Sequence, residues 1–273
     1  MLVFHRICTA VFLAILLAAA GGGSAQAKSS PFDAKAALAL SQAAVGSNLA
    51  KLHFTDSRKQ PVNLADLMDK PLVISLIYTG CADICPTVTE NLANAVEVAR
   101  DILGKDAFRV VTVGFDARND SPDRMRLYAA SRGIRVDGWY FLSADAATID
   151  QLARDLGFVF RPSPKGFDHM SQTSVVDTGG RVYRHIYGPD FDAPLLVEPL
   201  KQVIFGKRTE MTSLEGLLNR VRLYCTLYDP ASGTYRFDYS LIISIVLGGL
   251  SLALVGTVLV RALWRHRGPA RPA

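Results

Sequence analysis

The sequence predicts an α/β sandwich in which a mainly parallel core sheet is closed by a hairpin. Three observations support this fold class. Strand-like and helix-like segments alternate between residues 72 and 205. The first strand-like segment is a continuous apolar run typical of a strand buried on both faces, and the last two flank a Gly-Gly turn. The chain shows no internal repeat.

The first predicted strand and helix surround a pair of cysteines. Residues 72–78 (LVISLIY) form a continuous apolar, β-branched run, which predicts a buried strand. Residues 87–103 predict a helix, because Pro86 precedes them and Thr87 and Glu90 have capping-box spacing. The other elements expected in the domain are, in order, a strand at 108–116, a helix from the Ser121 cap to 131, a strand at 139–143, a helix from the Asp145 cap to 156, paired strands at 173–177 and 182–187, and a helix at 193–205.

The segments on either side of this unit are less strongly patterned. Residues 28–46 are rich in Ala and Ser, and they predict a leader to the fold or a loose helix. After the domain, residues 211–228 have apolar side chains at helical spacing, and Asp229 opens a turn-rich break that ends at Gly233. We therefore assign residues 207–238 to a membrane-proximal helix and linker.

The two ends of the chain have the patterns of targeting and membrane segments. Residues 1–27 combine a basic start, a short apolar run and an A-x-A site, which predicts a cleaved signal peptide rather than an uncleaved anchor. Residues 239–263 predict a transmembrane helix, because residues 239–260 carry no charge and are long enough to cross the hydrocarbon core. The arginines that follow predict a cytoplasmic tail, residues 264–273, by the positive-inside rule.

The charge of the chain is concentrated at these two ends. The 273 residues carry a formal net charge of +5, and 49% of them are hydrophobic with 4 Cys, which excludes a disordered chain, a collagen-like fibre and a disulfide-dense miniprotein. Arg6 lies in the signal peptide, and four arginines lie at or beyond residue 261. Residues 28–238 are therefore formally neutral, with 25 basic and 25 acidic residues, and we expect no binding to nucleic acid.

Cys81 and Cys85 lie between the first strand and its helix, in the segment GCADICP (residues 80–86). The positive end of a helix dipole lowers the pKa of a thiol there and favours the thiolate. A thiolate is the nucleophile of disulfide exchange and also a soft ligand for Cu(I), and a structural disulfide is a third interpretation of the same pair. Of the other two cysteines, Cys8 leaves with the signal peptide, and Cys225 is expected to be a small buried thiol on a helix face.

The motif around the cysteine pair resembles a known signature. Residues 78–87, YTGCADICPT, are similar to the Tyr-Thr-x-Cys-x-Asp-x-Cys-Pro-Thr signature of the Sco/SenC family, thioredoxin-like copper chaperones associated with cytochrome c oxidase assembly. The resemblance extends over residues 45–206, and its second anchor is an Asp-His pair before the late hairpin. It implies a thioredoxin-like fold and three copper ligands, which are Cys81, Cys85 and His169.

Other residues near these motifs have less specific roles. The segment FDARNDSP (residues 115–122) resembles the family's Asp-Pro-x-x-Asp segment without its Pro, and we leave Asp116 and Asp120 out of the ligand set. Asp168 either orients His169 or is an exposed loop carboxylate. The residues for which we expect packing or surface roles are Met170, His53 and His185.

These observations predict a metallochaperone anchored in the inner (plasma) membrane, with its domain in the periplasm, that receives copper from an upstream donor. Its expected target is the copper-binding subunit of cytochrome c oxidase or a related membrane oxidase. Two features depart from the family: Ala82 stands where Pro is frequent, and the predicted anchor is C-terminal instead of N-terminal. The alternative function is a thiol-disulfide oxidoreductase that reduces the cysteines of the oxidase copper site or of another exported protein, which needs Cys81 and Cys85 but not His169.

Overall fold

The computed structural model describes residues 32–82, 84–134, 136–206, 226–229, 234–237 and 240–266. The predicted signal peptide, Cys225, most of the membrane-proximal segment and the end of the predicted cytoplasmic tail lie outside the described residues.

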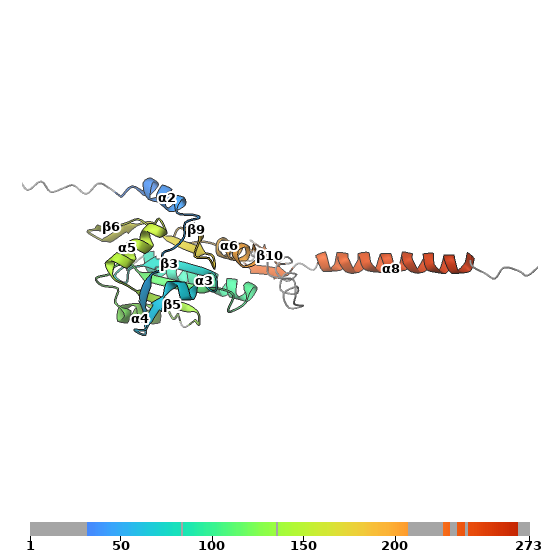
Figure 1. Ribbon diagram of the computed structural model, residues 1–273, viewed down its shortest axis with the longest axis horizontal. Coiled ribbons are helices and arrows are strands. Elements are labelled where there is room, and N and C mark those ends of the chain that lie inside the picture. Colours follow the sequence, from blue (N-terminus) through green and yellow to red (C-terminus); the bar gives the residue numbers. More distant parts are fainter. Residues whose placement is uncertain are drawn as a thin grey trace, which may run out of the picture. The chain divides into compact units, whose positions relative to one another are not determined.

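A seven-stranded mixed sheet forms the body of the domain, in the order β2-β1-β5-β4-β3-β8-β9 (Figure 1). The strands are β1 (His53–Asp56), β2 (Pro61–Asn63), β3 (Leu72–Ile77), β4 (Arg109–Gly114), β5 (Trp139–Ser143), β8 (Gln172–Val176) and β9 (Val182–Tyr187). All six residues of β3 are buried, as expected for the apolar run at its position. The late hairpin is confirmed, because β8 and β9 pair antiparallel.

The prediction that the sheet is mainly parallel is wrong. Strands β3, β4 and β5 are parallel to one another, but β1 pairs antiparallel with both β2 and β5, and β8 pairs antiparallel with both β3 and β9. The sequence did not predict the β1–β2 hairpin, because both strands are short and polar residues interrupt them. The hairpin extends the sheet on the β5 side with antiparallel strands.

The described part of the domain has five helices, and two of their predicted caps are confirmed. The Ser121 side chain accepts a hydrogen bond from the amide of Arg124 at 3.4 Å, and the Asp145 side chain accepts one from Thr148 at 2.8 Å. The segment predicted as a leader or a loose helix forms a ten-residue helix. The helices are α2 (Ala34–Ala43), α3 (Ile84–Leu103), α4 (Pro122–Ser131), α5 (Ala146–Asp155) and α6 (Ala193–Gly206), and a 3-10 turn covers Leu64–Leu67.

Helix α3 begins three residues earlier than the sequence predicts, at Ile84 instead of Thr87, so that Cys85 and Pro86 lie in its first turn. Pro86 does not prevent this start, because the amides of the first turn have no partner inside the helix. The amide of Cys85 instead donates to the sulfur of Cys81 at 3.3 Å. The Thr87–Glu90 capping box is therefore wrong, and a cysteine sulfur accepts at this helix start.

The C-terminal part differs from the prediction in one segment. Residues 226–228, assigned to the end of a helix, belong to strand β10 (Thr226–Asp229), which pairs antiparallel with β11 (Thr234–Phe237) on either side of the predicted turn. In the sequence, β-branched and aromatic residues on either side of Pro-Ala-Ser-Gly favour a hairpin over a helix.

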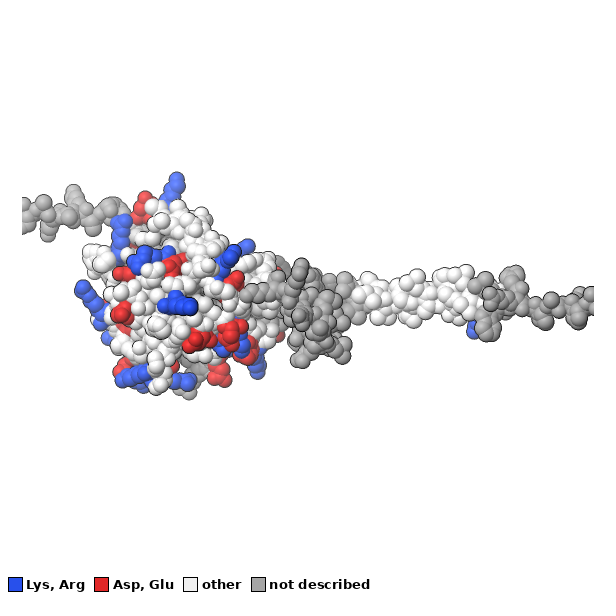
Figure 2. Space-filling view, in the orientation of Figure 1, with Lys and Arg blue, Asp and Glu red and all other residues white. Residues whose placement is uncertain are grey.

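Helix α8 (Ser240–His266) contains a stretch long and apolar enough to cross a membrane, Ile243–Ala262, with a mean hydropathy of 2.4. In Figure 2 the described surface of α8 is almost without charge, whereas Lys, Arg, Asp and Glu are intermixed over the visible face of the domain. The even mixture on the domain agrees with its formal neutrality.

Candidate metal centre

The cysteine pair lies at the junction of β3 and α3. Cys81 follows the end of β3 and is half-buried, whereas Cys85 lies in the first turn of α3 and is only 2% exposed. The amide of Cys85 donates to the Cys81 sulfur, and the two side chains are also hydrogen-bonded to each other. Both residues are thiols and are not joined by a disulfide bond. The structure thus brings the two predicted sulfur ligands together.

The expectation that the helix start lowers both thiol pKa values is wrong for Cys85. Burial raises the pKa of the Cys85 thiol, and the neighbouring Cys81 and Asp120 raise it further, while a backbone hydrogen bond from Tyr78 opposes them. Removal from water favours the neutral form of the thiol more strongly than the first-turn position favours its charged form. Cys85 therefore holds its proton at neutral pH in the metal-free protein.

His169 is the last residue of β7 (Gly166–His169), which pairs with β6 (Phe160–Ser163) in a separate two-stranded sheet. Its Nδ1 lies 3.0 Å from the carbonyl oxygen of Met170. A carbonyl can only accept, so Nδ1 carries the proton and the lone pair is on Nε2. Burial lowers the pKa of His169, which favours the neutral imidazole that a metal requires.

The residue that orients the His169 ring is therefore not Asp168. Asp168 is exposed on β7, and its charge is only a small influence that raises the pKa of His169. The backbone of Met170 supplies the hydrogen bond instead. Aromatic rings hold the imidazole from the sides, with centroid distances of 5.2 Å to Phe115 and 5.6 Å to Phe158.

Tyr78 connects the cysteine loop with the hairpin that carries His169. Its side chain, 8% exposed, is hydrogen-bonded to Cys81, and its ring lies 6.1 Å from the ring of His169 and 5.2 Å from that of Phe167. Burial, followed by the hydrogen bond with Cys81, raises the pKa of Tyr78 to about 12. The phenol therefore stays protonated at neutral pH and remains a hydrogen-bond donor. The sequence analysis assigns no role to Tyr78 beyond its place in the motif.

A buried carboxylate fixes the start of the cysteine loop. Asp120 is 2% exposed, and it accepts hydrogen bonds from the amide of Thr79 at 2.8 Å, the hydroxyl of Thr79 at 2.7 Å and the amide of Asp116 at 2.9 Å. Burial raises the pKa of Asp120, while these donors oppose the rise. The sequence analysis did not predict that Asp120 accepts hydrogen bonds from the start of the cysteine loop, although Asp120 belongs to the segment that resembles the family's Asp-Pro-x-x-Asp motif.

The three predicted ligands do not form a complete metal cluster. Across the residues that the structure describes, no three His, Cys, Asp or Glu side chains are grouped closely enough to hold a metal ion. Cys81 and Cys85 are adjacent, and His169 reaches the cysteine loop through Tyr78. The donor types nevertheless suit copper, because two thiolates satisfy Cu(I) and an added imidazole also suits Cu(II).

His53 and His185 have the surface and packing positions expected of them, whereas the packing role of the Met170 side chain stays a prediction. His53 is exposed on β1. His185 is 7% exposed, and its Nδ1 lies 2.9 Å from the hydroxyl of Ser174 within a buried polar cluster. Met170 contacts His169 through its backbone carbonyl.

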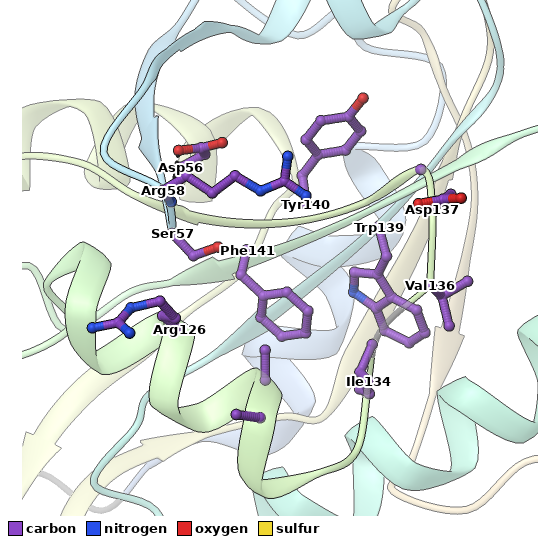
Figure 3. A pocket seen from close by; sticks show the side chains of 13 residues that line it. Asp56, Ser57, Arg58, Arg126, Ile134, Val136, Asp137, Trp139, Tyr140 and Phe141 are labelled. Carbon is purple, nitrogen blue, oxygen red and sulfur yellow. Dashed lines mark hydrogen bonds between the residues drawn. The ribbon is translucent and has the colours of Figure 1, made fainter.

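A pocket of about 550 Å³ lies away from these residues, between the β1–β2 turn, α4 and the start of β5 (Figure 3). Its charged lining is balanced, with two arginines and two aspartates, and its floor includes the aromatic side chains of β5. None of the three predicted ligands lines it. The charged residues of the lining are Asp56, Arg58, Arg126 and Asp137.

Comparisons with known proteins agree with the resemblance seen in the motif. A family model described as SCO1/SenC matches residues 43–204. A SCO1 protein homolog of Bacillus subtilis (strain 168) is 25% identical over 140 residues, which cover 50% of this chain and 71% of that protein.

Solved structures share the mixed α/β, thioredoxin-like fold of the domain. A putative electron transfer protein from Aquifex aeolicus VF5 superposes with a TM-score of 0.54 at 24% identity, over 61% of this chain and 97% of the other. Arabidopsis thaliana ScoI, solved with copper bound, superposes with a TM-score of 0.51 at 18% identity, over 59% of this chain and 99% of the other.

Proposed function

This chain belongs to the SCO1/SenC family, and on that premise we propose that it binds copper through Cys81, Cys85 and His169 and delivers it to a respiratory oxidase during cytochrome c oxidase assembly. The observation that carries the proposal is the contact between the two halves of the site. Tyr78 is hydrogen-bonded to Cys81 on one side and packs on the ring of His169 on the other. One side chain, Tyr78, therefore contacts both a soft sulfur donor and the imidazole, the two donor types that suit copper.

Copper is the cargo in this proposal, and the two thiols differ in their access to it. Cys81 is half-buried and accepts the incoming ion first, whereas Cys85 is 2% exposed and binds second. Binding of one Cu(I) by both sulfurs releases one proton from each thiol that is protonated beforehand. Delivery is a stepwise ligand exchange, in which acceptor thiols lose their protons and replace the accessible Cys81 and then Cys85, while the released donor sulfurs take up protons.

Helix α8 supports a membrane anchor for the same protein. Its apolar stretch, Ile243–Ala262, is long enough to span the hydrocarbon core, and Arg261 and the following residues suit a cytoplasmic end. With the predicted signal peptide, this orientation places the domain in the periplasm and the tail in the cytoplasm. An anchor in the membrane of the acceptor raises the effective concentration of the donor there. Enzymatic fusions at residues 238 and 273 test the orientation, since the proposal requires them to report opposite sides of the membrane.

Copper titration of the full-length chain in detergent, under reducing conditions, tests the binding function. We expect one Cu(I) per chain and a large loss of affinity in Cys81→Ser, Cys85→Ser and His169→Ala. The control is His53→Gln, because His53 is exposed on β1 and outside the site. Unchanged affinity in all three variants contradicts the proposal.

The same His169→Ala variant separates delivery of copper from reduction of the oxidase cysteines. A disulfide reductase needs only Cys81 and Cys85, so it would support oxidase assembly in cells even after His169 is lost. A copper donor loses that activity together with its affinity for copper. Oxidase activity of membranes from cells that carry each variant is the measurement.

A further inference from the structure

We propose that the Tyr78 hydroxyl is a positioning group that holds the hairpin β6–β7, and with it His169, against the cysteine loop. The inference rests on the copper-binding function proposed above and extends it to a residue outside the ligand set. Three independent contacts carry it, one to the cysteine loop and two to the hairpin.

The first contact joins Tyr78 to the cysteine loop. The residue follows the last residue of β3, Ile77, so its backbone is fixed by a strand whose six residues are all buried. Its side chain is hydrogen-bonded to Cys81, and a phenol O–H is a stronger donor than a thiol S–H. The backbone of Tyr78 is also hydrogen-bonded to the side chain of Cys85.

The second contact joins the same hydroxyl to the hairpin. The Tyr78 side chain is hydrogen-bonded to the backbone of Phe167, beside Gly166, where a β-carbon would lie 2.7 Å from the phenol oxygen. Phe167 lies two residues before His169 on β7, so the hydrogen bond fixes the strand close to the imidazole. The ring of Tyr78 also meets the rings of Phe167 and His169 edge-on, at 5.2 Å and 6.1 Å.

The third contact is steric and involves Gly166. A β-carbon at this position would lie 2.7 Å from the Tyr78 hydroxyl oxygen and 3.1 Å from two carbons of its ring. The Tyr78 ring has little room to move away, because it packs between Phe115, at 5.4 Å, and Phe167. Gly166 also has φ of +114°, which other residues rarely adopt. The glycine at residue 166 thus allows the backbone of the β6–β7 hairpin to contact the Tyr78 hydroxyl directly.

These contacts connect the Tyr78 hydroxyl to both the cysteine loop and the β6–β7 hairpin, which aromatic packing by the Tyr78 ring alone would not do. Among the described strands, β6 and β7 pair only with each other and share no ladder with the seven-stranded sheet. The hairpin is therefore held against the cysteine loop by contacts other than a strand ladder, and the Tyr78 side chain is hydrogen-bonded to both Cys81 and the hairpin. Its removal should loosen His169 while leaving the aromatic packing in place.

Histidine-ring NMR of the metal-free, full-length chain in detergent tests the contact directly. In Tyr78→Phe we expect the His169 signal to shift and the His185 signal to stay unchanged. The matched control is Tyr187→Phe, which also removes a hydrogen-bonded hydroxyl, 2.8 Å from Ser41, but lies beside His185, with ring centroids 6.1 Å apart. The control should therefore move the His185 signal and leave the His169 signal in place. An unchanged His169 signal in Tyr78→Phe overturns the proposal.

Copper affinity, measured by competition with a Cu(I) chelator, tests whether the hydroxyl acts through His169. We expect Tyr78→Phe to weaken Cu(I) binding about fivefold to tenfold in the unmodified chain, the effect of one lost hydrogen bond, and less than about twofold in the His169→Ala background. Equal losses in both backgrounds overturn the proposal, because the hydroxyl would then act on the cysteines alone.

Failure of the copper function is distinguishable from failure of the positioning role. If the unmodified chain binds no Cu(I), the proposed function is contradicted, and the metal-free His169 signal alone decides the inference. Gly166→Ala provides an independent test from the hairpin side and should move the same signal. Its control is Gly133→Ala, at φ of +66° with open space around it, which should leave the His169 signal unchanged.

Discussion

The backbones of Gly157 and Leu40 meet so closely that a β-carbon at residue 157 would lie 2.5 Å from the carbonyl oxygen of Leu40. Gly157 follows the C-cap of α5, and Leu40 lies on α2. Helix α2 therefore packs against the end of α5 through a backbone contact that leaves no room for a side chain at residue 157. The hydroxyl of Ser41, the next residue on α2, donates to Gln172 on β8 at 2.7 Å and adds a polar contact to the same junction.

Gly157→Ala should destabilise the domain strongly. Both Gly157, at φ of +61°, and Gly133, at φ of +66°, have a left-handed backbone that costs other residues about 1 kcal/mol, but only Gly157 faces a neighbour within 4 Å. We expect Gly133→Ala to lose about 1 kcal/mol of unfolding free energy and Gly157→Ala a further 1–3 kcal/mol, roughly the cost of overpacking. Denaturant unfolding of both variants gives the comparison, and equal losses would show that α2 is not held at this contact.

Asp120→Ala should loosen the start of the cysteine loop. The change leaves three donors, two of them on Thr79, without the carboxylate that accepts from them. We expect a loss of about 2–4 kcal/mol in unfolding free energy, because three partly buried donors lose their acceptor. The control is Asp123→Ala on the exposed surface of α4, which should cost far less. Thermal unfolding by near-UV circular dichroism checks both, and similar losses would contradict the bracing role of Asp120.

The buried His185 should make the domain less stable in mild acid. Burial lowers its pKa to about 4, against an ordinary value of 6.5. Between the folded and unfolded pKa values, His185 is protonated in the unfolded chain but neutral in the folded chain. The free energy of unfolding therefore falls as the pH falls, by up to about 3 kcal/mol. Urea unfolding between pH 4.5 and 7.5 measures the slope. His185→Gln should flatten it, and an equal slope in the variant would assign the effect to other groups.

Alkylation should distinguish the two thiols of the candidate site. Cys81 is half-buried, whereas Cys85 is 2% exposed and burial raises its pKa. We expect Cys81 to react with iodoacetamide at least about tenfold faster at pH 7.5, because only the accessible thiolate is nucleophilic. Peptide mass mapping after short exposures resolves the two sites. The difference in alkylation rate should disappear in denaturant. Equal rates in the folded chain would contradict the burial of the Cys85 side chain.

The elements predicted best from the sequence are those whose signals are local. Ser121 and Asp145 marked their helix starts because each lies directly before a helix and accepts from an amide three residues on. Strand β3 was predicted within one residue because a continuous apolar run between two layers of helices has no solvent-facing side.

The features that the sequence did not predict depend on contacts between distant residues. The start of α3 was misplaced because its acceptor is the sulfur of Cys81 and not a capping hydroxyl. Strands β6 and β7 were missed because they are four residues long and their residues are only partly buried or exposed. The role of Asp120 was hidden because its partners on Thr79 lie 41 residues away.

The separate ladder of β6 and β7 also has a consequence for engineering. Because this hairpin hydrogen-bonds strand to strand only with itself among the described elements, its backbone can be replaced as a unit without opening the seven-stranded sheet. A transplanted hairpin would need to keep Gly166 next to the Tyr78 hydroxyl, the backbone contact of Phe167 with Tyr78, and a metal donor at the position of His169. The choice of a third donor, whether imidazole, thioether or carboxylate, can in this way be varied on an unchanged dithiol scaffold.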